Sequence, residues 1–206
     1  MHSRSSASTA YPILSSLAER QSPRAFRAEP VTPAQLGSLL EAARWAPSCF
    51  NEQPWRFVFA HRSDGEAFER MASCLAAANA RWAAQAPVLM LSVAKTHFAR
   101  NDEPNRHAWH DVGLAVENLV VQAQSLGLGV HQMAGFDAAR AREVLAIPEG
   151  FEPVAMLAIG QPGDPEVLPD DLRARELAPR QRQPLANLAF EGRFGAIAPL
   201  AKSAPA

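Results

Sequence analysis

The spacing of hydrophobic positions changes from helical to strand-like several times along the chain. Thr32 precedes Pro33, and Gln35 stands three residues after the threonine. A threonine N-cap, a proline at the first helical position and a glutamine at the third are typical of a helix start. The apolar side chains that follow share one helical face: Leu36, Leu39, Leu40 and Ala43. Pro47 is expected to stop this helix.

The other elements follow from the same kind of pattern. A short helix is predicted in 11–20, ending near Arg20. Three more helices are predicted at 65–84, 109–126 and, capped by Asp137, 138–145. Strands are predicted at 55–60, 87–94, the start of 129–136 and 153–160. The apolar stripe of 109–126 is wide, which is typical of a helix buried in a core or an interface. These elements predict an α+β fold.

The length of the chain and the composition of its segments indicate its domain organisation. The 206 residues fit one domain, 1–206, in which 1–10 and 197–206 are expected to be flexible tails. After Gly163 the chain is rich in proline, arginine and glutamine, and we expect an extended arm there. The segment 96–109 is charged and aperiodic, which is typical of a long loop or a mobile lid. If it is a lid, His97, Phe98 or Trp109 would shape what binds beneath it.

Composition excludes several classes of function. The formal net charge is −1, so no basic footprint for nucleic acid is present. No apolar run approaches the roughly 18 residues that a membrane span requires, so no membrane partner is expected. The start "MHSRSSASTA" is not a secretory signal, and the two cysteines suggest no disulfide framework. We therefore expect a cytoplasmic protein.

Common catalytic and metal motifs are missing. There is no GxGxxG after a strand, no GxxxxGK[ST] and no GxSxG. His107, His110 and Asp111 could form a metal site on a helix, but supporting ligands are lacking. Solvated residues at a helix start are the simpler interpretation. No metal site is therefore expected. Cys49 could be a nucleophile, but no histidine has a telling position, so a small packing residue is preferred.

Three polar groups remain to be explained. The stretch "RWAPSCFNEQPWRFV", 44–58, places short polar side chains between two tryptophans, as at the edge of an apolar pocket. "RQSPRAF" places Arg20 and Arg24 around Ser22 in a turn. "PRQRQPL" places Arg180 and Arg182 on the same side of an extended arm. Arginine and serine together suit a phosphate, although arginines near termini are often simply solvated.

Taken together, these stretches resemble the nitroreductase family of FMN-dependent oxidoreductases. The order and spacing of "RQSPRAF", "APSCFNEQPW", "MAGF" and "PRQRQPL" carry the resemblance over about residues 12–195. It implies a central, mainly antiparallel sheet flanked by helices, and a homodimer in which the C-terminal arm is exchanged. FMN would bind at the dimer interface.

The resemblance also implies a role for individual residues. Those at the FMN phosphate and ribityl chain would be Arg20, Ser22, Arg24, Arg180 and Arg182. Those reaching the flavin from the partner subunit would be Pro47, Ser48, Cys49 and Asn51. Asn79 would contact the flavin ring, and the turn at Ala134 and Gly135 would face flavin N5. Trp82 and Ala134 stand where many members have lysine and glutamate.

The implied activity is the reduction of nitroaromatics, quinones or related electron-poor acceptors. NADH or NADPH would be the electron donor, in a ping-pong scheme in which the flavin performs the hydride transfer. No acid–base catalytic side chain is required. Two alternatives stay open. One is another reaction on the same fold, such as flavin fragmentation or reductive dehalogenation, and the other is a flavin binder without turnover.

Overall fold

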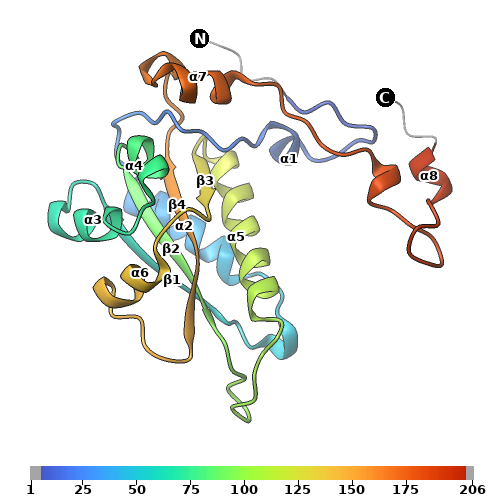
Figure 1. Ribbon diagram of the computed structural model, residues 1–206, viewed down its shortest axis with the longest axis horizontal. Coiled ribbons are helices and arrows are strands. Elements are labelled where there is room, and N and C mark those ends of the chain that lie inside the picture. Colours follow the sequence, from blue (N-terminus) through green and yellow to red (C-terminus); the bar gives the residue numbers. More distant parts are fainter. Residues whose placement is uncertain (1–5, 203–206) are drawn as a thin grey trace.

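The computed structural model describes residues 6–202 and is built on one four-stranded sheet (Figure 1). The strands are β1 (Trp55–His61), β2 (Val88–Lys95), β3 (Gly129–Met133) and β4 (Phe151–Gly160). Their order in the sheet is β1-β2-β4-β3, and every neighbouring pair is antiparallel. The predicted α+β class and the four predicted strands are therefore confirmed.

Helices cover both faces of the sheet (Figure 1). On one face pack α2 (Pro33–Arg44) and α5 (Ala108–Ser125), and on the other α3 (Gly65–Ala72), α4 (Ala77–Ala83) and α6 (Ala138–Val144). Alternate residues of the central strand β2 serve the two cores: Val88 and Met90 pack toward α5, and Leu89 and Leu91 toward α3. Burial on both faces explains why β2 is a continuous apolar run.

Local capping signals were predicted correctly. The Thr32 hydroxyl accepts a hydrogen bond from the Gln35 N–H at 3.2 Å, and the Gln35 side chain accepts one from the Thr32 N–H at 3.0 Å. This capping box starts α2 where the sequence predicts. Asp137 likewise caps α6, because its carboxylate accepts the Arg140 N–H at 2.9 Å.

The single helix predicted at 65–84 is wrong. The chain leaves the helical path between α3 and α4 because it pairs there with the turn that follows β3. The Ala76 N–H donates to the Gly135 carbonyl at 3.1 Å, and the Asp137 N–H donates to the Cys74 carbonyl at 2.8 Å. These bonds form with residues some sixty positions away, so helix propensity within 65–84 did not predict the break.

The prediction that everything after Gly163 is an unpacked arm is also partly wrong. A 3-10 turn, η2 (Pro165–Val167), leads into α7 (Asp170–Leu177). Leu168 and Leu172 are buried, and Arg81 on α4 forms a two-pronged ion pair with Asp171 at 2.8 and 2.9 Å. The chain is extended only beyond α7, before η3 (Leu185–Asn187) and α8 (Pro199–Lys202).

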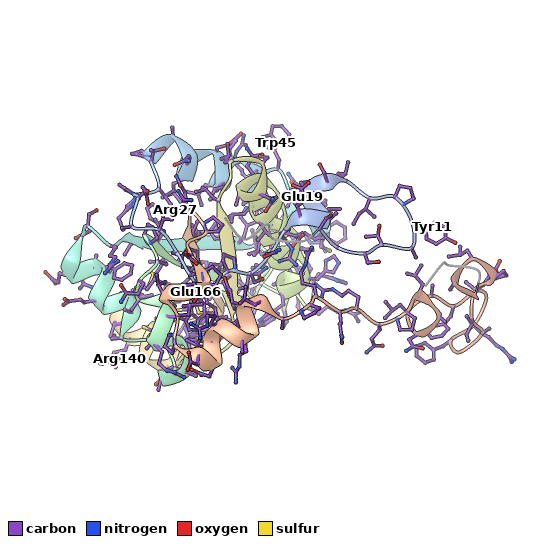
Figure 2. All side chains as sticks on the ribbon, turned by 90° about the horizontal axis from the view of Figure 1, so that it is seen from above. Tyr11, Glu19, Arg27, Trp45, Arg140 and Glu166 are labelled. Carbon is purple, nitrogen blue, oxygen red and sulfur yellow. The ribbon has the colours of Figure 1, made fainter. Side chains whose placement is uncertain are left out.

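The two terminal segments run out to the same side of the molecule (Figure 2). The N-terminal segment carries α1 (Ser15–Glu19), which ends at Arg20 as predicted, and the Tyr11 hydroxyl donates to the Leu200 carbonyl at 2.9 Å. The tail expectation for 1–5 and 203–206 lies outside the described residues, and the rest of it stays a prediction. No helix among residues 6–202 is long and apolar enough to cross a membrane.

Candidate functional site

The turn that carries the first basic cluster is fixed to the sheet. Pro23 lies against Gly129 so closely that a Cβ on the glycine would overlap the proline ring. His131 Nδ1 lies 3.1 Å from the Pro23 carbonyl oxygen, which can only accept, so Nδ1 carries the proton. Further along, the Arg27 N–H donates to the Gln161 carbonyl at 2.9 Å. The turn is thus held at the ends of β3 and β4.

The structure brings the N-terminal and C-terminal basic groups together. Arg20 Nη1 donates to Ser22 Oγ at 3.2 Å, and Arg180 donates to the carbonyls of Arg20 and Ala18 at 2.6 and 2.7 Å. Burial, followed by the nearby charges of Arg20 and Arg182, lowers the pKa of Arg180. Positive charges are therefore concentrated here, and a phosphate dianion is a group that would relieve their repulsion.

Arg24 is held by a carboxylate that sequence reasoning missed. Glu176 on α7 accepts the Arg24 backbone N–H at 2.9 Å, and its carboxylate lies 3.7 Å from the guanidinium. The Glu176 side chain is only 5% exposed, so this contact fixes α7 against the basic turn. One acidic group thus orients Arg24 and offsets part of the positive charge. A glutamate on a polar arm gives no sequence signal for such a role.

Trp82 stands where many family members have lysine, and it packs in the core. It is 2% exposed and lies between the rings of Phe26 and His131, with centroid distances of 6.5 and 4.5 Å. The Arg24 guanidinium lies 6.0 Å from the Trp82 ring centroid. Burial, followed by the Arg24 charge, lowers the pKa of His131 to about 4. The buried Trp82 therefore packs against the basic turn from the core side.

The ring-contacting residues implied by the resemblance also meet one another. Asn79 Nδ2 donates to the Gly135 carbonyl at 2.9 Å, and a Cβ on Gly135 would come within 2.7 Å of that nitrogen. Ala134 and Gly135 are exposed, and their backbone N–H groups donate to no acceptor among residues 6–202. Exposed N–H groups beside a fixed amide fit the polar edge of a flavin ring.

The polar loop at 47–51 lies at the opposite end of α5. The Cys49 N–H donates to the Asp111 carboxylate at 3.0 Å, near the start of that helix. By contrast, a pocket of about 200 Å³ next to the basic turn is lined by Pro23, Gln124 and Gly127, at the helix's other end. Asp111 and Gln124 are separated by roughly 20 Å of helix. One chain therefore does not bring Pro47, Ser48, Cys49 or Asn51 to the basic cluster.

The interpretation of Asp111 as a solvated residue is wrong. It is 2% exposed, and besides Cys49 its carboxylate contacts the His110 ring nitrogen Nδ1 at 3.0 Å. Asp111 thus fixes the start of the 47–51 loop. No cluster of three or more metal-ligating side chains occurs in the part of the chain that the structure describes.

A second loop, which the sequence suggested as a lid, packs on the first. Its ends pair through an isolated bridge between His97 and Pro104, so it is a narrow hairpin-like excursion. Phe98 contacts Phe50 edge to face with a centroid distance of 6.1 Å, and the Ala99 N–H donates to the Glu52 carboxylate at 2.8 Å. The two loops therefore lie against each other near the start of α5 (Figure 1). The expectation that they border a substrate stays a prediction.

Comparisons with known proteins agree with this geometry. The model of the nitroreductase family matches residues 17–161. A crystal structure of an oxidoreductase containing FMN superposes with a TM-score of 0.88 and 40% sequence identity, covering 92% of this chain and 96% of that one.

Two curated relatives are more distant. An FMN reductase [NAD(P)H] of Bacillus subtilis (strain 168) is 27% identical over 74% of this chain and 66% of the relative. A 5,6-dimethylbenzimidazole synthase of Rhodospirillum rubrum is 29% identical over 73% of this chain and 82% of the relative. Because the family model matches well over half of the chain and the sheet, helices and site agree with it, this chain belongs to the nitroreductase family.

Proposed function

We propose that this protein is an FMN-dependent oxidoreductase that takes electrons from NADH or NADPH and passes them to a small electron-poor acceptor. The observation that carries the proposal is the meeting of Arg20, Ser22, Arg24 and Arg180 in one cluster. The turn after β3 is exposed at Ala134 and Gly135, and Asn79 holds it through a hydrogen bond to the Gly135 carbonyl. Relatives described as an FMN reductase and an FMN-containing oxidoreductase support this assignment.

Each group of residues has a separate task in the proposal. The arginines and Ser22 would hold the phosphate, with charge-assisted hydrogen bonds. Asn79 and the Ala134–Gly135 amides would fix the ring edge. The bound flavin would supply the hydride chemistry, accepting from the nicotinamide and donating to nitroaromatics, quinones or similar acceptors in turn. This division explains why no acid–base side chain is needed at the centre.

The experiment that tests this proposal uses the purified protein. It should be yellow and release FMN, not FAD, on denaturation, and NADH or NADPH should bleach it anaerobically. A colourless protein that takes up no added FMN would overturn the flavin assignment. A yellow protein that neither nucleotide bleaches would be a flavin binder without turnover.

We further propose that the working unit is a homodimer with two shared sites. The 47–51 loop and the basic cluster lie at opposite ends of α5, so the loop of one chain would meet the cluster of the other. The terminal segments also expose large apolar side chains that a single chain leaves uncovered: Ile13, Leu14, Leu188, Phe194 and Leu200. Exposed apolar arms are typical of obligate interfaces, and exchange of the C-terminal arm would bury them.

A complementation experiment tests the shared site. Arg24→Ala damages the cluster, and Asn51→Ala damages the loop. If each site uses both chains, mixed dimers contain one intact site, so a random mixture regains about a quarter of the wild-type sites. A chain carrying both substitutions, mixed with wild type, supplies the matched control. Activity in the mixture of single variants no higher than the variants' own average would overturn the shared site.

A second candidate function has one observation in its favour. The similarity to a 5,6-dimethylbenzimidazole synthase suggests a reaction that consumes reduced flavin itself. Aerobic incubation of the reduced protein without acceptor separates the two. Quantitative recovery of FMN supports the reductase, and stoichiometric loss of FMN to a fragment supports the alternative.

A further inference from the structure

The two outer loops place a guanidinium against two aromatic rings. The Arg100 guanidinium carbon lies 4.1 Å from the centroid of Phe50 and 5.2 Å from that of Phe98. Arginine stacks on aromatic faces through its planar, delocalised cation, and such stacking fixes the plane of the group. The charge of Arg100 therefore has a defined position, although the residue itself is exposed.

The backbone keeps Phe50 outward at a cost. Phe50 is 69% exposed and adopts φ +52°, a left-handed conformation that side chains with a Cβ disfavour. Asn51, Gln53 and, in the facing loop, Asp102 also have positive φ. Strained residues that persist in a cluster are typical of functional sites. An exposed phenylalanine held in this way is a surface presented to something outside the chain.

The charges around Arg100 leave the cation available. No carboxylate forms an ion pair with Arg100 within residues 6–202. The Glu52 carboxylate, which comes from the other loop, accepts the Ala99 N–H at 2.8 Å. Asp102 and Glu103 are the acidic residues of the Arg100 loop itself, and both are exposed to solvent. The surface thus combines an aromatic face with a positioned positive charge.

We infer that Phe50 and Arg100 recognise acceptors that combine a flat aromatic ring with an anionic group such as a carboxylate. The inference rests on the proposed function, because the 47–53 loop would border the flavin of the partner subunit. The substrate ring would stack on the Phe50 side of the site, and its carboxylate would pair with the Arg100 guanidinium. Neutral acceptors would gain the ring contact alone.

The test compares two acceptors that differ in one charge, 4-nitrobenzoate and 4-nitrobenzamide. For each protein, the ratio of kcat/KM for the acid to kcat/KM for the amide is measured with saturating NADH or NADPH. Arg100→Gln should lower this ratio by about 2- to 5-fold, the effect of an ion pair that is open to solvent. Arg100→Lys, which keeps the charge but not the planar fork, should give an intermediate ratio.

Arg106→Gln is the matched control, because Arg106 is an exposed arginine just after the same loop, and the ring contacts there are made by Arg100. Its ratio should equal that of the wild type. An unchanged ratio in Arg100→Gln, with FMN binding and bleaching intact, would overturn this inference alone. So would a change confined to NADPH relative to NADH, which would assign the cation to the donor's phosphate. A wild-type protein that neither NADH nor NADPH bleaches would overturn the proposed function as well.

Discussion

The two ends of α5 differ in how their loops are held. Near its C-terminal end, the basic turn is fixed by Pro23 on Gly129, by His131 and by Glu176, and none of residues 20–27 has a positive φ. Near its N-terminal end, the loops at 47–53 and 96–104 contain a cluster of left-handed residues and an exposed Phe50. The first end is ordered by ordinary contacts, and the second is held in a conformation that the backbone disfavours.

This difference suggests that the two ends of α5 have different functional roles. A phosphate-binding turn gains affinity when its donors are fixed before the ligand arrives, because little ordering remains to be done on binding. Strained residues of this kind cluster at active sites, ligand clamps and switch segments. The comparison therefore predicts that changes at the basic end alter cofactor binding and pH stability. Changes at the loop end should alter local stability and acceptor choice.

The largest expected effect is the acid sensitivity of the basic end. The pKa of His131 is lowered from 6.5 to about 4, so between these pH values the unfolded chain binds a proton that the folded chain does not. The contribution of His131 to stability is therefore fully present above pH 6.5 and decreases as the pH falls toward 4, by about 3 kcal/mol in all. His131→Gln keeps a donor for the Pro23 carbonyl and should remove this dependence. Urea unfolding at several pH values measures it.

His61→Gln provides the control for that measurement, since His61 lies at the end of β1, away from the basic turn. Its stability should follow the wild-type pH curve. If His131→Gln and the wild type lose stability in parallel between pH 6.5 and 4, the neutral, buried state assigned to His131 is wrong.

The next effect concerns Arg24 as a phosphate ligand. Arg24→Ala removes a charge-assisted contact of about 1.5–3 kcal/mol, so FMN affinity should fall roughly 10- to 150-fold. It also removes the Arg24 charge from beside the buried Glu176 carboxylate, which disfavours a neighbouring phosphate further. Titration of the apoprotein followed by flavin fluorescence measures both FMN and riboflavin. Riboflavin, which lacks the phosphate, should lose little.

Arg27→Ala is the matched control, because Arg27 belongs to the same turn and its side chain is exposed. Its FMN affinity should remain near that of the wild type. An equal loss for FMN and riboflavin in Arg24→Ala would instead make Arg24 a residue that only supports the fold.

These two predictions also show what the sequence alone could supply. Local signals sufficed for the strands, because each strand is marked by its own apolar run, and for the capping box at Thr32, because its hydrogen bonds join residues three positions apart. The break between α3 and α4 depends on the distant turn at Gly135 and was missed. The arginines and the Ala134–Gly135 turn were proposed as site residues because their motifs resemble those of the nitroreductase family, and their roles stay predictions. Glu176, 152 positions from Arg24, was not, because nothing local marks which face α7 buries.

A smaller effect is expected at the loop end from Asp111. Asp111→Ala removes the acceptor of the Cys49 N–H and should lower the free energy of unfolding by about 1–2 kcal/mol. The loss is smaller than for a fully buried donor left unpaired, because the substitution also removes the cost of burying the Asp111 charge. Asp111→Asn keeps an acceptor oxygen and should restore most of the loss. Urea unfolding measures both. A fold destabilised equally by both variants would mean that the charge, and not the hydrogen bond, holds the loop.

The smallest effect tests the strain itself. Asp102 has φ +58° and is exposed. Glycine would remove the Cβ penalty of this conformation, which is roughly 1–2 kcal/mol in general and smaller for aspartate because its short side chain can hydrogen-bond locally. Glycine also gives the unfolded chain more freedom, worth about 0.5–1 kcal/mol. The two terms nearly cancel, and Asp102→Gly should change stability by less than about 0.5 kcal/mol.

Asp102→Ala keeps the Cβ without the polar side chain, and should be about 1 kcal/mol less stable than Asp102→Gly. Urea unfolding of the two variants isolates the backbone term, because neither carries a polar side chain. An alanine variant as stable as the glycine variant would show that this loop is unstrained, and the contrast between the two ends of α5 would then rest on Phe50, Asn51 and Gln53 alone.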